Sequence, residues 1–94
     1  MRSTIRLNLD MCILLNDITR MKSGQRPIKN IHRLALIIET RYDLDYDRIK
    51  DQMYKAQKTG YQQNDKVEGL DELIEKICLV LGTTRDELVK KVEQ

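Results

Sequence analysis

The chain has 94 residues, of which 40% are hydrophobic and 34% are charged, with a net charge of +2, as in one small globular domain covering residues 1–94. A chain this short leaves roughly 40% of its unfolded surface exposed after folding, so little of it remains to build a deep catalytic cleft, and we expect no enzyme. No apolar run approaches the ~18 residues that cross a bilayer, and residues 1–6 lack the pattern of a secretion signal, so we expect a cytoplasmic protein without a membrane partner.

The first segment, residues 5–18, is dense in apolar residues and fits two periodicities. Spacings of three and four indicate one face of a helix, formed by Leu7, Met11, Leu14, Leu15, Ile18 and Met21. Alternation with polar residues instead indicates a strand, and residues 3–9 stay open between the two. A helix over the whole segment has a second apolar stripe that the rest of the chain can hardly cover, which predicts self-association. The predicted oligomer interface consists of Ile5, Leu9, Cys12 and Ile13.

Two helices are predicted in the middle of the chain. Residues 23–27 end the first helix, because Gly24 suits a left-handed cap and Pro27 suits the first turn of a following helix. The second helix is predicted from Pro27 to Tyr42, with apolar residues at helical spacing. Asp45 is the predicted N-cap of a third helix, which carries Ile49 and Met53.

The last third of the chain predicts a loop and two more helices. Residues 59–65 are polar and aperiodic, as in a surface loop. A fourth helix extends from Leu70 to Leu81 and closes at Gly82, and Thr84 with Glu87 forms a capping box for a short last helix that carries Leu88 and Val92. The predicted fold is therefore all-α, with a lead helix, two helical hairpins and about five helices, plus a short N-terminal strand in one alternative.

The two cysteines and the single histidine exclude some classes of site. Cys12 and Cys78 both lie in apolar stretches, where a thiol behaves as a small hydrophobic group, so we expect both to be reduced core residues. A disulfide between them is the alternative, but two cysteines make a poor disulfide framework. His32 has no second ligand within helical reach, so we expect neither a metal site nor a cofactor.

The strongest local feature is the distribution of charge. Residues 1–34 hold seven Lys or Arg against two Asp, a net +5, whereas residues 35–94 hold ten against thirteen acids, a net −3. Residues 18–38 contain five basic residues and no acid. A helix N-terminus flanked by such charges attracts anions, because its first N–H groups lack partners. The predicted nucleic-acid or anion-binding residues are Arg20, Lys22, Ser23, Arg26, Lys29, Asn30 and Arg33.

These features favour a small non-catalytic regulatory protein that forms a homo-oligomer and binds nucleic acid through its phosphates, as a transcription regulator does. One alternative is an adaptor or inhibitor that binds an acidic surface of another protein. A second alternative is an oligomeric binder of a small phosphorylated ligand, such as a nucleotide. The sequence has neither a Gly-rich phosphate loop nor paired catalytic groups, which argues against turnover of that ligand.

The N-terminal part, residues 3–38, also resembles the ribbon-helix-helix repressors, on the alternating residues 4–10, a helix, Gly24 and a second helix that opens near Pro27. In that family two chains pair one strand each into an antiparallel ribbon that reads the major groove. The resemblance implies that Thr4, Arg6 and Asn8 contact bases, and that the backbone from Arg26 to Lys29 clamps a phosphate.

Overall fold

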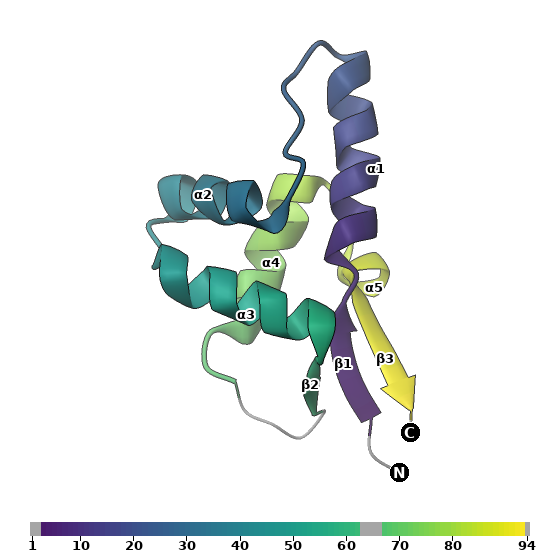
Figure 1. Ribbon diagram of the computed structural model, residues 1–94, viewed down its shortest axis with the longest axis vertical. Helices are drawn as coiled ribbons and strands as arrows, with labels where there is room; N and C mark the ends of the chain where they lie inside the picture. The colour runs from purple at the N-terminus through teal and green to yellow at the C-terminus, as the bar shows by residue number, and fades with distance from the viewer. Residues whose placement is uncertain (1–2, 63–66, 94) are drawn as a thin grey trace.

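The computed structural model describes residues 3–62 and 67–93, which form five helices and a three-stranded sheet (Figure 1). In chain order the elements are β1 (Ser3–Leu7), α1 (Leu9–Lys22), α2 (Ile31–Tyr42), α3 (Tyr46–Lys58), β2 (Tyr61–Gln62), α4 (Leu70–Leu81), α5 (Arg85–Leu88) and β3 (Val89–Glu93). None of the helices in this part of the chain is long and apolar enough to cross a membrane.

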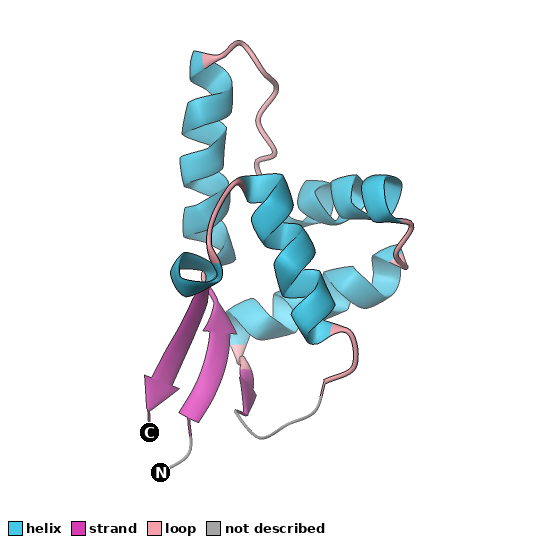
Figure 2. Ribbon diagram, turned by 180° about the vertical axis from the view of Figure 1, so that it is seen from behind, coloured by secondary structure: helices cyan, strands magenta, loops and turns pink. Residues whose placement is uncertain are grey.

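The fold is α+β. It is mostly helical, as predicted, but it also contains a sheet that the all-α prediction lacks. The sheet has the order β2-β1-β3 and is antiparallel throughout. The two ends of the chain meet in this sheet. β1 pairs with β3 from Ser3↔Glu93 to Leu7↔Val89, and Figure 2 shows the two strands side by side. The predicted last helix therefore stops at Leu88. Val89 favours extended backbone, and β1 supplies the hydrogen-bond partners there.

The predicted loop at residues 59–65 contains the short strand β2, while residues 63–65 of it lie outside the described part of the chain. Gly60 makes this strand possible. Its φ is +77°, and a Cβ there would lie 2.5 Å from the carbonyl oxygen of Ile5. Only glycine allows the chain to leave α3 and pass this close to β1, which lets the Tyr61 side chain enter the core.

β1 is extended, as the ribbon alternative requires, but the structure contradicts that alternative. β3 pairs with one edge of β1 along its whole length, and β2 pairs with the other edge at Thr4 and Ile5, so β1 has no continuous free edge for a second copy. Thr4 is buried, and the Arg6 guanidinium donates to the carbonyl oxygens of Gln57 and Lys58. Asn8 is half-buried where β1 leads into α1. The residues that the resemblance assigned to base contacts are therefore used within the monomer.

The core lies among α2, α3 and α4, whose apolar residues recur every three or four positions. The side chains with 0–1% exposure on these helices include Leu34, Ile38, Ile49, Met53, Leu73 and Ile77. The predicted helix boundaries hold at two caps: the Asp45 carboxylate accepts from the backbone N–H of Arg48, and the Thr84 hydroxyl accepts from that of Glu87. Gly82 closes α4 in the left-handed conformation.

The second helix begins at Ile31, four residues later than predicted. Pro27 lies instead in a loop, residues 23–30, that returns from the end of α1. The buried carboxylate of Asp17 accepts hydrogen bonds from the backbone N–H groups of Ile28 and Lys29, at 2.6 and 2.8 Å. α2 cannot begin within the loop, because the backbone of Lys29 is left-handed, with a φ of 74°, and that of Asn30 is extended, so the helix begins only beyond the N-cap Asn30.

α1 extends away from the other helices over much of its length (Figure 1). One face packs on α4 and α5 and buries three of the predicted interface residues, Leu9, Cys12 and Ile13, while Ile5 is half-buried in β1. These residues are covered by their own chain, so they are not free to form the predicted oligomer interface, and that assignment is wrong. The apolar residues that α1 exposes lie on its opposite face.

Candidate anion-binding site

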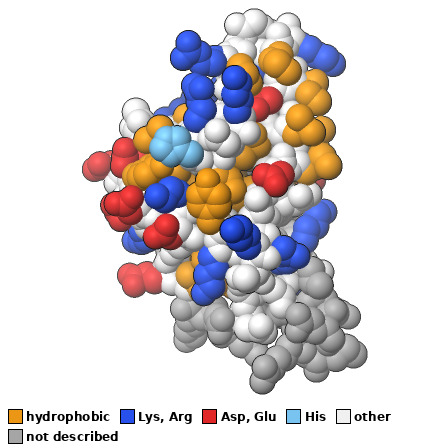
Figure 3. All heavy atoms as spheres, viewed as in Figure 1, with side chains coloured by type: hydrophobic (Ala, Val, Ile, Leu, Met, Phe, Trp, Pro, Cys, Tyr) orange, Lys and Arg blue, Asp and Glu red, His pale blue; other side chains and the backbone are white. Residues whose placement is uncertain are grey.

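Three arginines meet at a hollow between the end of α1, the loop 23–30 and α2. The hollow has a volume of about 250 Å³ and is lined by Arg20, Arg26, Pro27, Ile28, Arg33, Leu36 and Ile37. Each arginine comes from a different element, so the path of the chain brings them together rather than helical spacing alone. In Figure 3 several Lys and Arg side chains lie at the end of the molecule where α1 and this loop lie, and others are spread over its middle.

Arg20 is held in place by its own helix. Its Nε donates to Oδ1 of Asn16, one turn earlier, at 2.6 Å, and Nδ2 of Asn16 donates to the carbonyl oxygen of Leu81 in α4 at 2.9 Å. These two hydrogen bonds fix the orientation of the Arg20 guanidinium relative to α4. The bond to Asn16 uses Nε, so both terminal nitrogens remain as donors for a ligand.

The other two arginines are positioned by the loop and by α2. Arg33 is half-buried in the first turn of α2, and Arg26 is exposed on the loop. The Asp17 carboxylate fixes the loop beneath Arg26 through Ile28 and Lys29, and Ile28 is itself buried at 1% exposure. A pinned loop lowers the entropy that Arg26 loses when it binds a ligand.

Within the described residues, none of the three arginines of this hollow forms an ion pair with a carboxylate. Across residues 3–62 and 67–93, the ion pair of the structure joins Arg85 to Asp71, on α5 and α4, which do not line the hollow. None of the lining residues is acidic. Asp17, which contacts the loop from below, is buried and already accepts two backbone N–H groups. The hollow therefore combines three cations with an apolar floor.

The structure brings together three of the seven predicted site residues. Lys22 and Ser23 are exposed at the end of α1 and do not line the hollow. Lys29 is exposed and has a φ of 74°, and Asn30 accepts from the backbone N–H of Arg33 as the N-cap of α2. Asn30 thus occupies part of the helix N-terminus that was predicted to bind the anion.

The apolar floor of the hollow was not predicted. It consists of Pro27, Ile28, Leu36 and Ile37. A signal for two of these residues exists in the sequence, because Leu36 and Ile37 follow Arg33 by three and four positions and so share its helix face. For the two loop residues the sequence offers none, since their position depends on the contact with Asp17.

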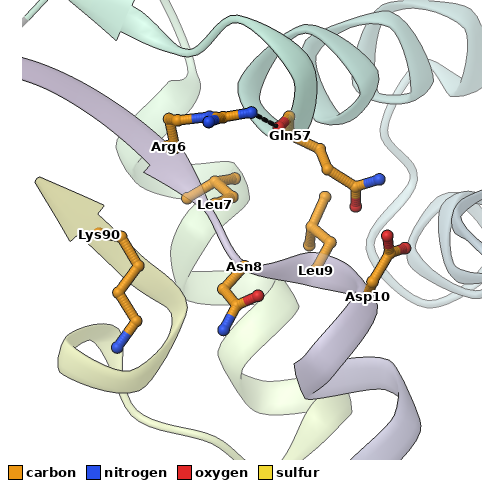
Figure 4. Close-up of a pocket in the computed structure, with 7 residues that line it drawn as sticks. All are labelled: Arg6, Leu7, Asn8, Leu9, Asp10, Gln57 and Lys90. Carbon is orange, nitrogen blue, oxygen red and sulfur yellow. Dashed lines mark hydrogen bonds between the residues drawn. The ribbon is translucent and has the colours of Figure 1, made fainter. Parts of the chain in front are cut away.

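A second hollow, of about 310 Å³, lies beside the junction of β1 and α1 (Figure 4). Its polar lining mixes charges, with Arg6 and Lys90 facing it together with Asp10, Asn8 and Gln57. The Arg6 guanidinium donates to the carbonyl oxygens of Gln57 at 2.8 Å and Lys58 at 2.5 Å, and so stabilises the negative end of α3. With that cation engaged and a carboxylate present, this hollow suits an anion less than the arginine hollow does.

Metal-binding and nucleophilic groups are sparse in the part of the chain that is described. It contains no cluster of three or more His, Cys, Asp or Glu side chains that could hold a metal ion. His32 is exposed and shares a hydrogen bond with the Tyr46 hydroxyl. Cys12 and Cys78 are free, and burial raises the pKa of both thiols, which disfavours the reactive thiolate.

Comparisons of the chain with protein-family models, with curated proteins and with solved structures found no match.

Proposed function

We propose that this protein binds nucleic acid through the phosphate backbone, with Arg20, Arg26 and Arg33 as the main contacts and Lys22 and Lys29 as flanking charges, in a regulatory and non-catalytic role. The observation that carries the proposal is the convergence of three arginines from three elements on one hollow without a carboxylate in its lining. Arginine suits this task because its planar guanidinium donates two parallel hydrogen bonds to phosphate oxygens.

Binding of this kind depends on phosphate and carries little sequence information. The hollow has an apolar floor, which can pack against sugar carbons, whereas base reading needs polar side chains that reach into a groove. Each phosphate neutralised releases condensed counterions, so affinity for duplex DNA falls as salt rises, by about 0.9 log units per tenfold salt for each contact.

The test is the salt dependence of binding to a fluorescently labelled DNA duplex, measured by anisotropy. The variant Arg20→Ala/Arg26→Ala/Arg33→Ala lowers the affinity at low salt and reduces the slope of log K against log salt by about 3 units. The matched control, Arg41→Ala/Lys58→Ala/Arg85→Ala, removes the same charge from exposed residues outside the hollow. Equal effects of both variants, or an unchanged slope in the first, contradict the proposal.

A small phosphorylated ligand is the second candidate, and the concave shape of the site favours it. A volume of about 250 Å³ lies just below the usual range for small-molecule pockets and accommodates one phosphoryl group. Titration with inorganic phosphate and with nucleoside monophosphates, followed by the amide shifts of residues 26–37, separates the two candidates. Saturation by a mononucleotide with no gain from longer DNA favours the small ligand, and binding of an acidic polypeptide but not of DNA favours an adaptor.

A further inference from the structure

A continuous apolar stripe covers the outward face of α1. Met11, Leu14, Leu15, Ile18 and Met21 are 49%, 53%, 54%, 39% and 58% exposed, and Figure 3 shows hydrophobic side chains along this edge of the molecule. The opposite face of α1 carries the buried residues Leu9, Cys12, Ile13 and Asp17. α1 is thus apolar on both faces, and its own chain covers one of them.

The size of the stripe matches the interface of a small dimer. Five large side chains, each about half exposed, present roughly 500 Å² of apolar surface, close to the largest patch of a typical soluble monomer. Two such stripes in contact bury about 1,000 Å², which is the lower bound for a specific interface between two chains.

The order of residues in the stripe says how two copies fit. Met11, Leu14, Ile18 and Met21 are separated by three, four and three residues, the spacing of a coiled-coil seam. This spacing reads the same in both directions, so in an antiparallel pair Met11 lies level with Met21 of the second copy, and Leu14 with Ile18. From these observations we propose that the protein forms a homodimer in which two α1 helices pack antiparallel through this stripe, around a twofold axis that passes between the two helices, perpendicular to both and level with their middle.

The charges at the two ends of α1 favour this direction over the parallel one. The first turn of α1 contains Asp10, and the last turn contains Lys22, whereas Arg20 in that turn faces the arginine hollow. Parallel helices place like charges side by side, whereas antiparallel helices place the basic end of one copy beside the acidic end of the other and oppose the two helix dipoles.

A second acidic group, Glu87, lies on the same flank of the stripe as Lys22. Lys22 follows Leu15 by seven residues, so both lie on one flank of α1. At the base of α1, a hollow of about 250 Å³ next to Leu15 is lined by Cys12, Thr83 and Glu87, among others. A twofold axis perpendicular to the helices keeps equal flanks together. The dimer therefore brings Lys22 of each copy toward Glu87 of the other.

The first experiment measures the mass of the full chain in solution by light scattering or sedimentation over a range of concentrations. The wild type sediments as a dimer, and Leu14→Glu/Ile18→Glu halves the mass, because four carboxylates then meet at the seam. The control, Leu79→Glu, changes the most exposed leucine of α4, at 60%, and keeps the dimer. Circular dichroism of each variant shows whether the helices remain. A monomeric wild type, or a folded double variant that stays dimeric, overturns the proposal.

A charge exchange tests the direction of the helices. Lys22→Glu and Glu87→Lys each raise the dimer dissociation constant several-fold, and their combination in one chain restores it, because each copy then offers the exchanged pair. Loss in the combined variant equal to the sum of the single losses overturns the antiparallel arrangement. Leu14→Glu/Ile18→Glu changes neither the lining of the arginine hollow nor its flanking lysines, so phosphate binding of this variant can fail or succeed independently of the dimer.

Discussion

Asp17 and Ile28 are joined by a hydrogen bond of 2.6 Å from the backbone N–H of Ile28 to one carboxylate oxygen of Asp17, and the other oxygen accepts from Lys29 at 2.8 Å. Asp17 is only 6% exposed and Ile28 only 1%. A side chain of α1 thereby determines the path of the loop 23–30, on which Arg26 lies. The candidate binding site depends on this contact as much as on the arginines.

We therefore expect Asp17→Ala to destabilise the protein by about 2–4 kcal/mol, because it leaves two backbone donors without partners, one of them buried. Urea unfolding measures this loss, and hydrogen exchange at the amides of Ile28 and Lys29 shows whether the loop opens. Asp17→Asn, which keeps one acceptor oxygen, loses about half as much. An Asp17→Ala variant as stable as the wild type contradicts this role.

Gly60 and Gly24 form a natural pair for separating backbone strain from steric contact. Both have positive φ, +77° and +73°, but a Cβ at Gly60 meets the backbone of Ile5 at 2.5 Å, and a Cβ at Gly24 meets nothing within 4 Å. Gly24→Ala is expected to cost about 1 kcal/mol from strain alone. Gly60→Ala is expected to cost about 3 kcal/mol or more, because β2 must also move away from β1.

Thermal and urea unfolding of both variants measure the two costs. Amide shifts of Thr4 and Ile5 report on the pairing of β1 with β2, and they should change in Gly60→Ala but not in Gly24→Ala. Equal costs at the two positions show that the close approach at Gly60 is relieved without loss of structure.

The sequence predicts the helices well where local signals agree with packing. Asp45 and Thr84 cap the helices assigned to them, and apolar residues at helical spacing in α3 and α4, such as Ile49, Met53, Leu73 and Ile77, are buried. The sequence does not predict strands whose pairing partners are far away in the chain. Val92 continues the helical spacing of Leu88, and nothing near it indicates that β1, more than eighty residues earlier, supplies the hydrogen-bond partners of this segment.

α1 shows the same limit for the candidate surfaces. It carries two apolar stripes, and the hydrophobic pattern does not say which one faces the body. Polar side chains decide it, since Asn16 donates to the carbonyl oxygen of Leu81 and Asp17 accepts from the loop, both from the face that carries Cys12 and Ile13. The arginines were predicted as a group because they are close in sequence. Their convergence on a hollow depends on the path of the loop.

Arg6 provides a test of the helix-end interaction shown in Figure 4. Its guanidinium donates to the last carbonyl oxygens of α3, at Gln57 and Lys58, where the helix dipole is negative. Arg6→Met keeps the length of the side chain but removes the donors, and we expect a loss of about 1 kcal/mol in urea unfolding, reduced by solvent exposure. Lys90→Met, at the same hollow, is the control and should change stability by less.

The thiols of the buried Cys12 and the half-buried Cys78, together with Tyr61, make the protein less stable at alkaline pH. Burial raises the pKa of Cys12 and Cys78 above their ordinary 9.0, and that of Tyr61 above its ordinary 10.0. The unfolded chain therefore loses these protons first, and the free energy of unfolding falls as the pH rises past 9. Below that pH both states hold the protons, so these groups make no pH-dependent contribution. Urea unfolding at about pH 7, 9 and 10.5 measures the decline.

Substitution identifies the groups responsible for this decline. Cys12→Ala/Cys78→Ala lowers stability by a similar amount at every pH, because it creates small cavities, but it flattens the slope between pH 9 and 10.5. Tyr61→Phe removes a hydroxyl that donates to the carbonyl oxygen of Gln52 and flattens the slope above pH 10. Tyr54→Phe, at an exposed tyrosine, leaves the profile unchanged. If the cysteine variant retains the wild-type slope, other groups cause the alkaline loss, and burial of the two thiols has no thermodynamic consequence.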